Sequence, residues 1–362
     1  MRAEHLPFVF LSLLALLVGL WSGLGRIGWA LPEPHAGLAL AHGPLMVCGF
    51  LGTLIGLERA AALGQVWAYG APLLSALGVV ALLTGLPAPF LFIAASLGLV
   101  VIFGYLLRLQ GAMFMMITAA GAGVWLVGNV FWLAGAAVFS TVPWLTGFLV
   151  LTIVGERLEL SRLMRPSLSA HAVLLSGVVV YLAGLVGTVA ALAAGERVAG
   201  IGMAVMALWL LRHDIARHTI RQAGLVRFIA SSLLSGYAWL LIGGGLWMVL
   251  GGAMAGPAYD AMLHVVFLGF VFGMLFAHAP IILPAILGRP VPYRPHFYGP
   301  LALLNASMLL RFGADLGGWP DGRRWGGLLG ALAILLFLAT TAGAAAFPRV
   351  PHPAWRAGMR SE

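Results

Sequence analysis

Long apolar stretches separated by short polar breaks dominate the pattern of this chain. Each stretch is about twenty residues long, which is the length a helix needs to cross the hydrocarbon core of a bilayer. The breaks carry Pro, Gly or charged residues. The pattern therefore predicts an all-α integral membrane protein with about twelve transmembrane helices. The predicted spans lie at residues 7–31, 36–58, 66–86, 88–107, 112–136, 139–156, 170–193, 198–212, 226–250, 259–287, 297–314 and 325–347.

Composition supports this prediction. Hydrophobic residues make up 62% of the 362 residues and charged residues only 9%, whereas soluble domains carry roughly 25% charged residues. A chain this apolar cannot cover itself with polar surface, so a lipid bilayer is its expected surroundings. No polar stretch is long enough to fold separately. We predict one polytopic transmembrane domain over residues 1–348 and a short cytoplasmic tail over residues 349–362.

The formal net charge of +9 comes from arginine, since the chain has no lysine. The arginines stand singly between apolar segments, which is typical of a topology signal and gives no reason to expect nucleic acid as a partner. In a twelve-span topology most of them fall on one side of the membrane, and this bias predicts that both termini are cytoplasmic. The minority expected on the other side are Arg26, Arg197, Arg311, Arg323 and Arg324.

A short repeat recurs at every fourth predicted span. Residues 50–59 and 148–157 share the pattern Phe-Leu-x-x-x-Ile-x-x-Glu-Arg, and the tenth span contains Phe267-Leu268-Gly269. Repeats of this kind often bring related helices together around a central site. The alternative is that apolar helices share these letters by chance.

Two histidines inside spans are candidate ligands, because an ionisable side chain in the membrane is costly and is usually functional. His42 lies near the outer start of the second span and His264 near the outer start of the tenth. Both spans run inward, so the two imidazoles are expected at similar depth. A haem with two axial histidines requires two such imidazoles facing each other from neighbouring helices. The alternative is a structural histidine that bonds Ser, Thr or a backbone carbonyl.

Other polar residues are candidates for ligands or for a proton path. His278 follows His264 by fourteen residues, about 21 Å along a helix, and would present a metal ligand near the opposite surface. His35 is an alternative outer ligand or an ordinary interfacial residue. Glu58 and Glu156 end their spans beside arginines, where they form either charge pairs or a proton path from the cytoplasm.

Arg311 and Arg26 are candidate anion contacts near the outer surface. Arginine binds carboxylates with two parallel hydrogen bonds, so either side chain would suit a haem propionate. The alternative for Arg311 is an ion pair with Asp315, one helical turn further on.

Two segments resemble the NnrS family. They are His42-x-x-x-Met46-x-x-Gly49-Phe50 and His264-x-x-x-x-Gly269-x-x-x-Gly273-Met274-x-x-x-His278, the second followed by Gly288-Arg289-Pro290. The resemblance implies a twelve-span protein of the bacterial inner membrane that is associated with haem, copper and nitric oxide stress. It also implies a layout similar to the catalytic subunit of haem–copper oxidases, with three pseudo-repeated groups of four helices.

The sequence also departs from these families. Pro44 stands where NnrS proteins tend to have a second histidine, and the sixth span carries Glu156 and no histidine. A copper site with three histidines is therefore not expected.

The resemblance implies a b-type haem held by His42 and His264, with Arg311 and Arg26 as propionate contacts and with copper left open at His278. The expected role is electron transfer, gas sensing or nitric oxide stress handling, with a redox partner or a small gas ligand. An alternative is a cofactor-free secondary transporter with a polar path along the second, sixth and tenth helices, in which His278 and Glu156 carry protons. A third possibility is a subunit whose surface binds another membrane protein.

Overall fold

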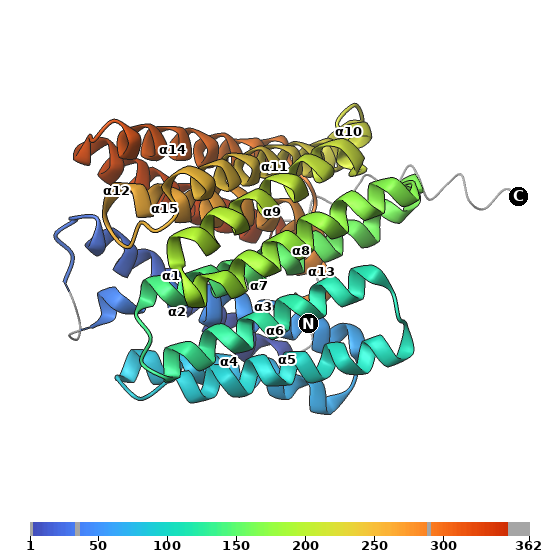
Figure 1. Ribbon diagram of the computed structural model, residues 1–362, viewed down its shortest axis with the longest axis horizontal. Coiled ribbons are helices and arrows are strands. Elements are labelled where there is room, and N and C mark those ends of the chain that lie inside the picture. The colour runs from blue at the N-terminus through green and yellow to red at the C-terminus, as the bar shows by residue number, and fades with distance from the viewer. Residues whose placement is uncertain (1–2, 33–36, 288–290, 347–362) are drawn as a thin grey trace, which may run out of the picture.

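The computed structural model describes residues 3–32, 37–287 and 291–346, and these residues form helices and no strand. The long helices lie side by side along the longest axis, with α4 (Gly70–Thr84) and α5 (Pro89–Leu109) at one edge of the molecule and α14 (Tyr298–Leu316) at the opposite edge (Figure 1). The predicted tail at 349–362 and the candidate His35 lie outside the described residues.

Eleven helices in the described part of the chain are long and apolar enough to cross a membrane. The chain is therefore a multi-pass α-helical membrane protein, and most predicted span boundaries hold within a few residues. The eleven are Leu6–Arg26, Leu38–Leu63, Val66–Thr84, Pro89–Leu109, Met113–Leu133, Val138–Ser161, Leu168–Ala190, Leu192–His213, Gly224–Leu250, Gly256–Pro284 and Pro320–Ala346. In Figure 1 the unbroken helices among these are α1, α5 to α9, α11 and α15, in chain order.

The remaining predicted span, 297–314, corresponds to α14. This helix has the length of a span but is less apolar, because Asn305, Arg311 and Asp315 interrupt it. Arg311 and Asp315 are buried, and α14 packs along α15 (Pro320–Ala346). Its polar side chains therefore face other helices, which is how polar residues are accommodated at membrane depth.

The second and tenth spans each contain a π-helical segment, which the sequence pattern did not predict. π-Helical turns are rare and frequently mark functional sites. The second span consists of η2 (Leu38–Ala41), α2 (His42–Pro44), the π segment η3 (Leu45–Gly52) and α3 (Thr53–Leu63). The tenth consists of α12 (Gly256–His264), the π segment η6 (Val265–Val271) and α13 (Phe272–Leu287). In both spans the π segment begins within three residues after the histidine.

The sixth and tenth predicted spans, which share the short repeat with the second, are the most deeply buried of the described spans. In α7 (Val138–Ser161) 78% of the most apolar stretch is buried, and in Gly256–Pro284 72%, against 28% in α1 (Leu6–Arg26). The sixth and tenth spans thus form the centre of the bundle, while α1 covers one side of it.

Glycine permits the closest helix contact in the bundle. α8 (Leu168–Ala190) packs against α9 (Leu192–His213), and a Cβ atom at Gly184 would overlap the backbone of Ala199. Small residues at such contacts let two helix backbones approach each other.

We predict that Gly184→Ala lowers stability by about 1–3 kcal/mol, because the added methyl group overpacks this contact. Gly245→Ala in α11 (Gly224–Leu250) is the matched control, since a Cβ atom added at Gly245 would meet nothing within 4 Å. Thermal unfolding of the detergent-purified variants checks this. Equal melting temperatures for the two variants would contradict the close contact.

Candidate functional site

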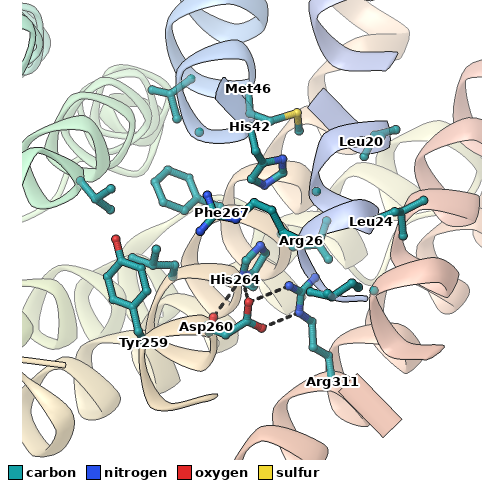
Figure 2. Close-up of a pocket in the computed structure, with 18 of the residues that line it drawn as sticks. Leu20, Leu24, Arg26, His42, Met46, Tyr259, Asp260, His264, Phe267 and Arg311 are labelled. Atoms are coloured by element: carbon teal, nitrogen blue, oxygen red, sulfur yellow. Dashed lines mark hydrogen bonds and ion pairs between the residues drawn. The ribbon is translucent and has the colours of Figure 1, made fainter. Parts of the chain in front are cut away.

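A pocket of about 420 Å³ lies where α1, the second span and the tenth span meet α14 and α15. His42, His264, Arg26 and Arg311 all line it (Figure 2). The structure therefore brings together four predicted site residues from four helices far apart in the sequence. His278, Glu58 and Glu156 do not line this pocket.

The His42 ring is held against the backbone of α1. Its Nδ1 lies 2.7 Å from the carbonyl oxygen of Gly19. The ring also fills the space beside Gly23, where a Cβ atom would lie 2.7 Å from Cε1 of the imidazole. Because a carbonyl oxygen can only accept, Nδ1 of the neutral ring carries the hydrogen.

The His264 ring is held by its own helix. Its Nδ1 lies 3.0 Å from the carbonyl oxygen of Asp260 and 3.2 Å from Oδ1 of the same residue. The Asp260 carboxylate accepts two hydrogen bonds from Arg311, at 2.7 Å from Nε and 2.8 Å from Nη2. Figure 2 shows this chain of contacts from Arg311 through Asp260 to His264.

The two imidazoles face each other across the pocket as a matched pair. Their ring centres are 6.2 Å apart and their planes differ by 24°. Eight residues further along each helix, Phe50 and Phe272 form a second pair, with ring centres 6.1 Å apart and planes 23° apart. The second and tenth spans therefore run past each other in register, which confirms that the two histidines lie at the same level.

This geometry leaves two nitrogens available as metal ligands. Each Nδ1 is engaged by backbone, and no hydrogen bond to either Nε2 is found among the described residues. In a neutral imidazole whose Nδ1 carries the hydrogen, Nε2 keeps its lone pair and can bind a metal. Two metal–nitrogen bonds of about 2.0–2.1 Å, extended to the ring centres, span about 6.3 Å. The observed separation of the ring centres, 6.2 Å, is of this size.

The two candidate anion contacts differ in their partners. Arg311 pairs with Asp260 and not with Asp315, while Asp315 lies 3.8 Å from Nε of Arg323. The Arg311–Asp315 pair, the alternative considered for Arg311, is thus replaced by a contact between helices. No ion pair or hydrogen bond of Arg26 is found in the described part of the chain, and Arg26 is a cation that lines this pocket.

His278 belongs to a second polar cluster at the opposite end of the bundle. Its Nδ1 lies 2.8 Å from the carbonyl oxygen of Met274, and its Nε2 lies 3.5 Å from Nη1 of Arg157. A guanidinium only donates, so Nε2 of His278 is the acceptor. Among the described residues, no group of three or more His, Cys, Asp or Glu could hold a metal ion. This arrangement gives His278 no co-ligand within that part of the chain.

Ion pairs, one of them buried, belong to the same cluster. Arg157 makes two hydrogen bonds of 2.9 Å to Asp214, and both side chains are buried. Arg59 from the second span pairs with Glu156 from the sixth, and it also lies 3.7 Å from Glu58. The second and sixth spans thus meet at this end through charges, and the tenth joins them through the His278–Arg157 hydrogen bond.

Two carboxylates of these sites, Asp260 and Asp214, were not predicted from the sequence. Asp260 stands four residues before His264, on the same helical face, and a carboxylate at the start of a span was a usable signal. Asp214 follows the end of α9, in a segment whose sequence is typical of a solvated extension. The sequence pattern therefore did not predict that Asp214 is buried against Arg157.

A protein-family model described as a domain of unknown function, DUF8744, matches residues 5–346. No curated protein and no solved structure matches the chain.

We predict that Asp214→Ala destabilises the protein by about 3–5 kcal/mol, because it leaves the buried Arg157 charge unpaired. Asp321→Ala is the matched control, since the Asp321–Arg324 pair is exposed and such pairs contribute only about 0–1 kcal/mol. Thermal unfolding measures both variants. An Asp214→Ala variant as stable as Asp321→Ala would show that the buried pair is not needed for folding.

Proposed function

The chain belongs to the DUF8744 family, and we propose that it is a haem-binding membrane protein similar to the NnrS family. One observation carries the proposal: His42 and His264 face each other with ring centres 6.2 Å apart, each with its Nδ1 bonded to backbone. Two imidazoles from neighbouring helices, each with its Nδ1 bonded and its Nε2 left for a metal, suit the axial ligand set of a b-type haem.

The surroundings of the pair suit this cofactor. The pocket volume of about 420 Å³ falls within the range of cofactor sites. Arg26 lines the pocket, has no partner among the described residues and suits a propionate. Arg311 suits one less well than we expected, because Asp260 already occupies two of its donors. A bound haem would supply an iron for electron transfer or for binding a small gas such as nitric oxide.

The number of membrane crossings, the side on which the termini lie and the grouping of the helices belong to the same proposal. We place α14 as the twelfth crossing, both termini in the cytoplasm, and the protein in the bacterial inner membrane. The layout would then be three groups of four helices, as in haem–copper oxidases, with a redox partner or a gas ligand acting on the haem. Copper is not part of the proposal, since His278 has a guanidinium beside its Nε2.

A cofactor-free transporter is the second candidate, and one observation favours it. The cluster that contains Arg59–Glu156 and Arg157–Asp214 brings charges from the second and sixth spans beside His278 of the tenth. Chains of Glu, Asp and His within a membrane are typical of proton relays.

We predict that the purified protein, reduced with dithionite, shows a sharp Soret band and an α-band at one haem per chain. His42→Ala and His264→Ala each lower the haem content, because each removes one axial ligand. His218→Ala is the control, since His218 lies in α10 (Ala216–Thr219), outside the pocket. Equal haem content in all three variants would contradict the ligand assignment.

The transporter candidate makes a different prediction for Glu156→Gln. If Glu156 carries protons, proton-coupled uptake into vesicles falls at least about tenfold, as expected when a positioned proton-transfer group is lost. The haem spectrum stays unchanged, because Glu156 lies outside the pocket. A colourless wild-type protein with Glu156-dependent uptake would favour the transporter over haem binding.

A further inference from the structure

The two imidazoles of the pocket have unequal supports. Nδ1 of His42 has one partner, the neutral carbonyl of Gly19 at 2.7 Å. Nδ1 of His264 has the Asp260 carbonyl at 3.0 Å and also the Asp260 carboxylate at 3.2 Å. Of the two rings, His264 is therefore the one that donates toward a carboxylate.

The carboxylate is itself fixed in place. Arg311 from α14 binds both oxygens of Asp260, through Nε at 2.7 Å and Nη2 at 2.8 Å. Two parallel hydrogen bonds define the orientation of a carboxylate as well as its position. Asp260 thus has little freedom to turn away from His264.

A carboxylate that accepts from Nδ1–H raises the basicity of the opposite imidazole nitrogen and fixes the ring orientation. We propose that Asp260 is a positioning residue that makes His264 the stronger metal ligand, so that His42 is the imidazole that yields when a second ligand competes for the site. This inference rests on the proposed haem function and deepens it.

The wall of the pocket around His42 is largely apolar. Leu20, Leu24 and Met46 line the pocket, and Figure 2 shows Leu20 and Met46 on the His42 side. The charged pair of Asp260 and Arg311 lies on the His264 side. Displacement of His42 would therefore open a position lined by these apolar side chains, with the Arg26 guanidinium in the same pocket.

Carbon monoxide binding to the reduced, purified haem protein tests the order of the ligands. His42→Ala should keep more of its haem than His264→Ala and bind carbon monoxide at least about tenfold faster than wild type, because no imidazole has to leave first. His264→Ala should lose haem affinity by more than the roughly 10- to 100-fold expected when only a partner of a metal ligand is removed, because it removes the stronger ligand itself. The reverse order, with His264→Ala the haem-retaining variant, would overturn the proposal.

Resonance Raman spectroscopy tests the role of Asp260 directly. In the His42→Ala background, Asp260→Asn should lower the iron–histidine stretching frequency, and Asp260→Glu should restore most of it. Asp321→Asn is the control for loss of one exposed carboxylate. If Asp260→Asn leaves the frequency unchanged, Asp260 is only structural and the inference fails.

A second variant controls for misfolding of Asp260→Asn, because that substitution leaves Arg311 without its partner. Asp260→Asn combined with Arg311→Met removes that charge and should shift the frequency in the same direction; an unshifted frequency in this variant counts against the inference.

A wild-type protein that binds no haem overturns both the proposed function and this inference. Haem-loaded protein with equal effects of His42→Ala and His264→Ala overturns this inference alone.

Discussion

A charge inside a bilayer must find its partner within the protein, and this constraint organises both ends of the bundle. Near one end, Arg311 of α14 pairs with Asp260 of the tenth span. Near the other, Arg157 pairs with Asp214, and Arg59 with Glu156. Each pair joins helices that are distant in sequence, so the pairs also fix which helices lie at the centre. The two histidines of the pocket take their orientation from the same network and from backbone carbonyls.

The contrast between the three central histidines follows from this constraint. His278 has a guanidinium beside its Nε2, which commits that nitrogen to a hydrogen bond within the protein. His42 and His264 use Nδ1 for the backbone, and both line a shared pocket. The same residue type therefore has a structural role at one end of the tenth span and a candidate ligand role at the other. Position alone along the helix did not distinguish these roles.

Periodicity and length were enough to predict the spans, because a bilayer admits few structures besides apolar helices. They also predicted the common level of His42 and His264, since two helices that run in the same direction place equivalent residues at equal depth. The partner of Arg311 was not predictable in this way, because the choice between Asp260 and Asp315 is made only when the helices pack. The π segments after both histidines were also missed, since they alter hydrogen bonding without altering the apolar pattern.

The central claim is that His42 and His264 together bind one haem iron. Electron paramagnetic resonance of the oxidised protein, produced with ¹⁵N-labelled histidine, tests this most directly. A low-spin ferric signal with hyperfine coupling from two histidine nitrogens is the predicted result. A haem-loaded protein with a high-spin signal, or with coupling to a single histidine, would contradict the paired geometry as a ligand site.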